Sequence, residues 1–120
     1  MRLARIEQHD FDVADAMRRL GGREALYRRL MAEFVVTFGP GLGELPRLLA
    51  DAKVEEARRG MHTLEGISAN LSAGRVRRAA MELRLAVKAG ETALDPLLHA
   101  LEQALASAVQ SARKLAQPEE

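Results

Sequence analysis

The sequence predicts an all-α fold, an antiparallel up-and-down four-helix bundle with a short extra helix at its N-terminus. Hydrophobic residues make up 48% of the 120 residues but aromatic residues only 3%, which is typical of helices that pack through aliphatic side chains. Apolar residues recur at helical spacing along most of the chain, and no segment alternates as a strand does. Short connections between the last three helical segments favour antiparallel neighbours.

The first helix is expected directly after Asp12, which can cap it, and the glycines at 21–22 end it. A long second element follows and is interrupted at residues 39–41. We expect a kink or break near Pro40, with Pro46 as a second candidate, because proline removes an intrahelical hydrogen bond.

Three amphipathic helices follow, over about residues 54–71, 74–89 and 92–115. The whole chain, 1–120, is expected to form one domain, because its length suits a single buried core. Residues 1–10 and 116–120 are expected to be the frayed ends of that domain.

The composition excludes several classes of function. The 18 Lys and Arg residues nearly balance the 17 Asp and Glu residues, so no overall field favours nucleic acid or an anionic membrane. The absence of cysteine excludes disulfides and thiolate chemistry, and the histidines at 9, 62 and 99 lack metal-ligand spacing. We therefore expect no metal and no cofactor. Without a long apolar run or a secretion signal, a cytoplasmic protein with no membrane partner is expected.

Arginines are concentrated on the two predicted helices at 54–71 and 74–89. Nucleic-acid binding through them is disfavoured, because the chain has no helix-turn-helix signature and few aromatic side chains to stack on bases. An acidic protein surface is the better-fitting target. The arginines are Arg58, Arg59, Arg75, Arg77, Arg78 and Arg84.

His62 is predicted to lie on the outer side of its helix. The apolar positions cluster on one side and face the core, whereas His62 shares the other side with charged or small residues. A histidine packed inside the bundle is the alternative, but it fits this pattern poorly. The predicted core positions are Ala57, Gly60, Leu64, Ile67 and Leu71; the residues beside His62 are Glu55, Arg58, Arg59, Glu65, Gly66 and Ala69.

Gly66 lies one turn after His62 on the same face of the helix. A glycine inside a helix lowers helix stability by about 0.5–1 kcal/mol relative to alanine, so we look for a functional reason for it. Its missing side chain leaves the imidazole accessible to another protein, and the small side chain of Ala69 extends the open surface. Close helix packing is the alternative reason, which suits Gly60 on the core face better than Gly66.

An accessible imidazole that is neutral near pH 7 is a competent nucleophile, and phosphoryl transfer suits it. A phosphoryl group on His62 would lie mid-helix, away from the positive end of the helix dipole, so nearby cations would be its main stabilisers. Arg58 and Arg59, one turn earlier, are candidates for this role. Alternatively, they are solvated side chains paired with Glu55.

Several motifs of the chain occur together in one known family. They are His62-Thr63-Leu64-Glu65-Gly66, Asn70-Leu71-Ser72-Ala73, the apolar positions Val76, Ala80 and Leu83, and weaker upstream matches at Phe11-Asp12, Leu20-Gly21-Gly22, Leu26-Tyr27 and Phe34. With these motifs the chain resembles the histidine-containing phosphotransfer (HPt) domain, a helical relay module of multistep two-component signalling. The resemblance implies that His62 accepts a phosphoryl group from one receiver-domain aspartate and passes it to another.

The same resemblance implies a phosphoryl carrier without autokinase or ATPase activity. Its partners would be response-regulator receiver domains and a hybrid sensor kinase, and any Mg²⁺ would belong to the receiver. Docking would use the surface around His62 with Gly66, Ala69 and Arg84. Because no heptad seam is sustained, we expect a monomer.

Three positions depart from the family pattern. Glu65 replaces a lysine, Arg84 replaces an acidic residue and Ser72 replaces a glycine. Antiparallel pairing places residues 65 and 84 at the same height, so we hypothesise a Glu65–Arg84 contact that draws the carboxylate away from His62. One competing hypothesis is a phosphorylation-incompetent bundle that regulates by binding a receiver domain or kinase. Another is a helical adaptor outside phosphorelay signalling.

Overall fold

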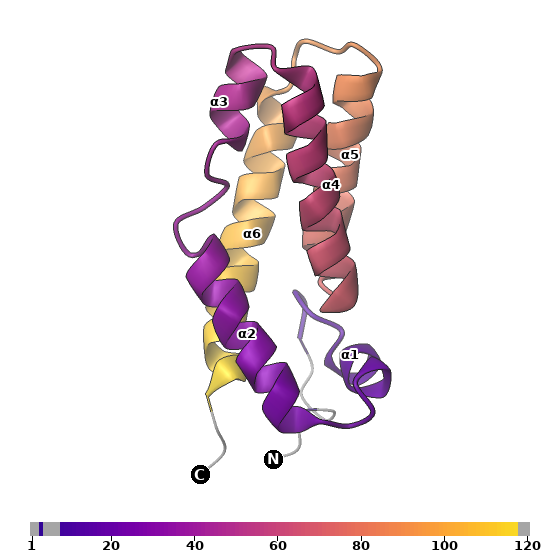
Figure 1. Cartoon of the computed structure of the whole chain (residues 1–120), viewed down its shortest axis with the longest axis vertical. Coiled ribbons are helices and arrows are strands. Elements are labelled where there is room, and N and C mark those ends of the chain that lie inside the picture. The colour runs from indigo at the N-terminus through magenta and orange to yellow at the C-terminus, as the bar shows by residue number, and fades with distance from the viewer. Residues whose placement is uncertain (1–2, 4–7, 118–120) are drawn as a thin grey trace.

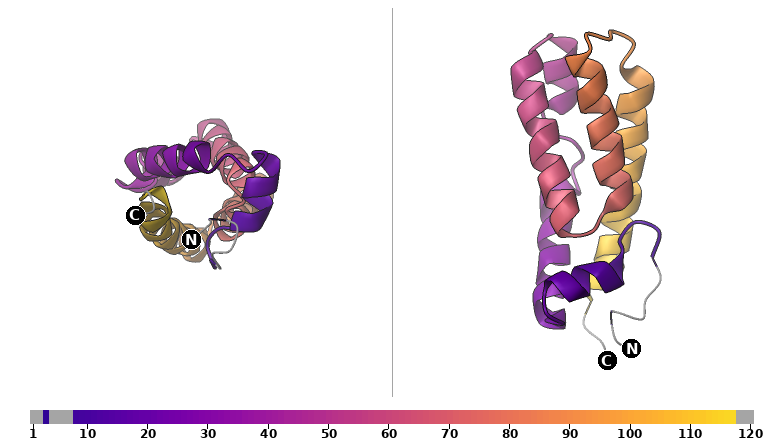
Figure 2. Two further views of the ribbon diagram at one scale, coloured as in Figure 1. Left: turned by 90° about the horizontal axis from the view of Figure 1, so that it is seen from below. Right: turned by 90° about the vertical axis from the view of Figure 1, so that its right-hand side faces the viewer.

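The computed structural model of the chain describes residue 3 and residues 8–117. Within these residues it contains six helices and no strand, which confirms the predicted all-α class. The helices are α1 (Val13–Arg19), α2 (Glu24–Phe38), α3 (Leu45–Ala50), α4 (Val54–Asn70), α5 (Gly74–Lys88) and α6 (Asp95–Ala116). They form an elongated body of 48 × 23 × 20 Å, with α4, α5 and α6 along its length and α1 across one end (Figure 1; Figure 2). Over the described residues, no helix has the length and apolarity that a membrane span requires.

The predicted long second element is two helices, α2 and α3. The connection between them contains Gly41 and Gly43, whose φ angles of 101° and 61° are left-handed conformations that favour glycine. The expected break near Pro40 is therefore confirmed. Pro46 causes no second break, because it lies in the first turn of α3, where a missing N–H costs no intrahelical hydrogen bond. The break lets α2 pack on α6 while α3 packs on α4.

The helix boundaries follow the predicted ranges closely. Helices α4 and α5 each end one residue before the predicted end. Helix α6 begins at Asp95, three residues later than predicted, and has Pro96 in its first turn, where the fixed φ of proline suits a helix start.

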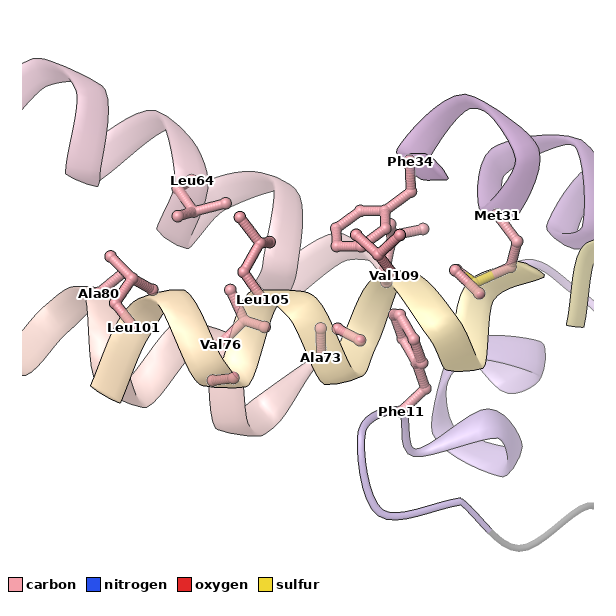
Figure 3. Close-up of a cluster of buried hydrophobic side chains, with 14 of the residues drawn as sticks. Phe11, Met31, Phe34, Leu64, Ala73, Val76, Ala80, Leu101, Leu105 and Val109 are labelled. Atoms are coloured by element: carbon pink, nitrogen blue, oxygen red, sulfur yellow. The ribbon is translucent and has the colours of Figure 1, made fainter. Parts of the chain in front are cut away.

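The core lies between α6 and the helices on either side of it. Buried residues recur every three or four positions along α6, as expected of a helix with one apolar face. Phe11 and Phe34 meet edge to face, with ring centroids 5.7 Å apart, and close the core near α1 (Figure 3). Alanines elsewhere let the helix backbones approach closely. The buried apolar residues of α6 and of its neighbour α5 are Leu101, Ala104, Leu105, Ala108, Val109, Ala112, Leu115, Val76, Ala80, Leu83, Ala86 and Val87.

Helix α1 is fixed against the turn that joins α4 to α5. Asp12 caps α1 as predicted, since its carboxylate accepts the backbone N–H of Asp15 at 3.0 Å. The backbone N–H of Asp12 donates to the carbonyl of Ser72 at 2.9 Å, and the Ser72 hydroxyl donates to Asp15 at 2.7 Å. Arg19 donates to the carbonyl of Ala69 at 3.0 Å. The end of the His62 helix is therefore held from outside the bundle as well as from inside.

The chain before α1 is tied into the bundle at Asp10, which is only 4% exposed. Its carboxylate accepts hydrogen bonds from Ser107 at 2.9 Å and Ser111 at 2.6 Å, and pairs with Arg75 at 3.2 Å. The predicted frayed end at 1–10 is therefore wrong at Asp10, because polar partners on α5 and α6 hold the carboxylate, and Leu3 is also buried. Residues 1–2, 4–7 and 118–120 of the predicted ends lie outside the described residues.

We predict that Asp10→Ala lowers the free energy of unfolding by about 2–3 kcal/mol, because it removes the acceptor of two hydroxyls and a guanidinium. Asp51→Ala, at an exposed position after α3, is the matched control and should change stability little. Chemical denaturation of both variants measures the difference. Equal stability would contradict the anchoring role of Asp10.

A second prediction concerns Ser72, whose hydroxyl is the main cause that lowers the pKa of Asp15 below its ordinary value, with help from Arg19 and Arg18. A carboxylate with a lowered pKa stabilises the fold above its unfolded pKa, and this stability is lost as the pH falls through the folded pKa. Ser72→Ala should therefore raise the pKa of Asp15. The difference in the free energy of unfolding between Ser72→Ala and the parent protein should become smaller below about pH 4.

NMR titration of the Asp15 carboxyl carbon and denaturation at neutral and acidic pH test this prediction. An unchanged pKa in Ser72→Ala would contradict the hydrogen bond as its cause. Ser72→Gly serves as a comparison, because it removes the same hydroxyl while suiting the positive φ of 57° at this position.

Candidate functional site

His62 is exposed on the outward side of α4. The buried side of the helix is formed by Ala57, Met61, Leu64 and Ser68, and Leu71 is buried just after it. The predicted core position of Gly60 is wrong: Gly60 is exposed. Met61 takes that place because its long apolar side chain fills the space between helices, which a glycine cannot do.

The surface next to His62 is bare at Gly66. A Cβ atom built on Gly66 would meet no heavy atom within 4 Å, and the same holds for Gly60. Close helix packing, the alternative reason for a glycine in this helix, therefore explains neither residue. The chain carries two open glycines on one helix, of which only Gly66 shares a face with His62.

An open hollow lies beside His62 between α4 and α5. Three arginines and one glutamate line it, so the positive charge of the arginines dominates there. It gathers the predicted phosphate-environment residues Arg58 and Arg59 with Arg84 of the next helix, whereas Glu65, Gly66 and Ala69 are not among its walls. The lining residues are Glu55, Arg58, Arg59, His62, Thr63 and Arg84. Sequence reasoning missed Thr63, although its place directly after His62 was a signal.

The two arginines of α4 differ in their surroundings. Arg58 Nη1 donates to Glu55 Oε1 at 2.6 Å, so the alternative of a pair with Glu55 holds for Arg58. Arg59 is exposed and forms no ion pair within residues 8–117. The charge of Arg58 is therefore largely balanced inside the hollow, and that of Arg59 is not.

The hypothesised contact between Glu65 and Arg84 is confirmed. Arg84 Nε donates to Glu65 Oε2 at 2.6 Å and Arg84 Nη2 donates to Glu65 Oε1 at 3.1 Å. Both side chains are mostly covered, at 23% and 12% exposed. These hydrogen bonds, more than the charge of Glu65, raise the pKa of Arg84 above its ordinary value, so Arg84 stays charged. The carboxylate is thereby directed at α5.

The remaining candidates lie around this centre. Ala69 is half-buried, and Arg19 of α1 reaches its carbonyl, so α1 borders the surface at that end. His9 and His99 are exposed at other places in the chain. In the part of the chain that the structure describes, no three His, Asp or Glu side chains are arranged to hold a metal ion.

A second, largely apolar groove lies on the opposite flank of α4, facing α2 and α1. Sequence reasoning did not predict it, because it exists only where α2 leans on α6 and leaves α4 uncovered. Its lining residues are Arg19, Leu20, Leu30, Glu33, Phe34, Thr37, Phe38, Ile67, Asn70 and Leu71.

The sequence model of the Hpt domain family matches residues 29–115. This range contains His62 and both partners of the Glu65–Arg84 pair, while the upstream motifs from Phe11 to Tyr27 lie outside it. No curated protein and no solved structure matches the chain. Hpt domains are phosphocarriers in phosphorelays, where they interact with receiver domains and kinases. Because the match covers well over half of the sequence, the chain belongs to the Hpt domain family.

Proposed function

We propose that the protein relays a phosphoryl group between receiver-domain aspartates through His62 in a multistep two-component phosphorelay. The observation that carries this proposal is the position of His62: an exposed imidazole within the matched range, in an open hollow lined by three arginines. A neutral imidazole is a competent nucleophile, and cations beside it favour the charge of a phosphoryl group.

The transfer is a displacement at phosphorus. A nitrogen of His62 attacks the aspartyl phosphate of a docked receiver, the N–P bond forms as the O–P bond breaks, and the aspartate carboxylate leaves. The same steps in reverse pass the group to a second receiver. The protein contributes position and electrostatic stabilisation, which are the main requirements of phosphoryl transfer. It acts as a carrier and supplies no ATP-binding or autokinase activity.

The proposed partners are response-regulator receiver domains and a hybrid sensor kinase, which dock on the surface around His62 with Gly66, Ala69 and Arg84. Open space at Gly66 supports this choice. The proposal includes a monomeric, cytoplasmic protein in which α2 and α3 together replace one long helix of an antiparallel four-helix bundle.

The alternative is a bundle that binds a receiver or kinase without carrying phosphate. It rests on Glu65, whose carboxylate would repel a phosphoryl group on His62. The two hydrogen bonds from Arg84 weaken this argument, because they hold the carboxylate and balance its charge.

Incubation with a phosphorylated receiver domain tests the function. The parent protein and His99→Ala should acquire acid-labile, base-stable label, and His62→Ala should acquire none. Label on His62→Ala would contradict the assignment of the histidine. Binding of the receiver by the parent protein without any label would favour the binding-only alternative.

Two glycine variants test whether the bare surface serves docking. Gly66→Ala and Gly60→Ala should each raise the free energy of unfolding by about 0.5–1 kcal/mol, because the added Cβ meets nothing and alanine is the better helix former. Only Gly66→Ala should slow transfer from a phosphorylated receiver, by about tenfold, because it displaces the docked partner from His62.

Denaturation gives the stability of the two glycine variants, and quenched-flow labelling gives their transfer rates. Gly60→Ala is the matched control, since it makes the same change on the same helix, away from the face of His62. Equal transfer rates in both variants would remove Gly66 from the docking surface.

A further inference from the structure

Arg84 has hydrogen-bond donors left over after it binds Glu65. A guanidinium group carries five N–H donors, and the contacts with Glu65 use the Nε and Nη2 positions. The Nη1 group of Arg84 donates to no acceptor within the described residues. Arg84 lines the hollow beside His62, whereas Glu65 does not. The pair therefore presents its positive member to the hollow that His62 also lines.

The other two cations of the hollow are less suited to bind that group. Arg58 pairs with Glu55, which itself lines the hollow, so this pair brings a carboxylate as well as a guanidinium to the site. Arg59 is exposed, and binding would have to order its whole flexible side chain. Arg84 is already ordered by two hydrogen bonds across the helices, so it loses little further freedom.

We propose that Arg84 binds the phosphoryl oxygens of phosphorylated His62, and that Glu65 is the positioning residue that holds Arg84 in place for this contact. The inference rests on the proposed function, since it concerns the same histidine. It gives the Glu65–Arg84 pair a role beyond stability. Arg84 of α5 is the cation that contacts the phosphoryl group, and Glu65 of α4 orients Arg84.

The proposal can be tested without any partner protein, because phosphoramidate can load the histidine directly. A nitrogen of His62 attacks phosphorus, and the new N–P bond replaces the bond between phosphorus and the amino group. The amino group leaves as ammonia, taking up the proton that the imidazole loses. The loaded phosphoryl group then reports its surroundings through its own titration, which the ³¹P chemical shift follows. A bound guanidinium favours the dianion and lowers this pKa.

The measurement is a ³¹P NMR titration of the loaded full-length protein, with His9→Ala and His99→Ala in every variant, because these two exposed histidines could also be loaded. Arg84→Gln should raise the pKa of the phosphoryl group by about half a unit to one unit relative to the parent protein. Arg78→Gln is the matched control, because it removes an equal charge from an exposed position of α5; it should shift the pKa far less. A value for Arg84→Gln equal to that of Arg78→Gln would overturn the proposal.

Glu65→Gln separates positioning from simple charge. If Glu65 acted only as a nearby negative charge, its removal would lower the pKa of the phosphoryl group. If it positions Arg84, its removal should raise that pKa, because the guanidinium is no longer held toward the phosphate. A lowered pKa would overturn the positioning role.

Arg84→Gln leaves the mostly covered carboxylate of Glu65 without its partner, which can destabilise the fold. A second variant therefore tests the pKa without this unpaired charge. The double variant Glu65→Gln/Arg84→Gln removes both charges and should raise the pKa as Arg84→Gln does. The two proposals can fail separately. If no receiver labels the protein but the pKa of the phosphoryl group depends on Arg84, this inference is supported and the relay function is not. If a receiver labels the protein but the pKa is the same with and without Arg84, the relay function is supported and this inference is overturned.

Discussion

The two-point ion pair between Glu65 on α4 and Arg84 on α5 determines the chemical character of the surface around His62. Without it, α4 would carry an unpaired carboxylate one turn from the imidazole, and α5 would carry a mobile cation. With it, the negative group is turned to the neighbouring helix and the positive one is fixed beside the hollow. The pair is possible only because α4 and α5 pack as close antiparallel neighbours, so the turn that joins them sets the electrostatics of a residue two to three turns away.

That turn is itself stabilised by an element that takes no part in the hollow. Helix α1 crosses the end of the bundle and bonds to Ser72 and Ala69 (Figure 2). The buried faces of α4, α5 and α6 are filled by aliphatic side chains, many of them alanine, which lets these helices pack closely. The molecule thus combines a tightly packed interior with an outer face of α4 on which two positions, Gly60 and Gly66, carry no side chain. Local helix stability is lower there than alanine would give.

The sequence predicts those features that depend on neighbouring residues or on helical register. The cap at Asp12, the break near Pro40 and the exposure of His62 follow from local patterns, and the Glu65–Arg84 contact follows from the pairing of two helices across a short turn. The anchor at Asp10 could not be predicted, because Ser107 and Ser111 lie about a hundred positions away in the chain. The prediction that Gly60 faces the core is wrong because helical periodicity assigns faces from the polarity of side chains, and glycine has no side chain. The apolar groove beside Ile67 depends on how α2 leans, which no periodicity encodes.

The exchange of charges between positions 65 and 84, relative to the family pattern, constrains how this surface can change over time. Starting from a lysine on α4 and an acidic residue on α5, either substitution made alone would put two like charges into partly covered positions that face each other. Passing through an uncharged residue at one position would leave the other ion half-desolvated and without a partner. Each single step is therefore unfavourable, and the two arrangements of charge are separated by a barrier that only paired replacement avoids.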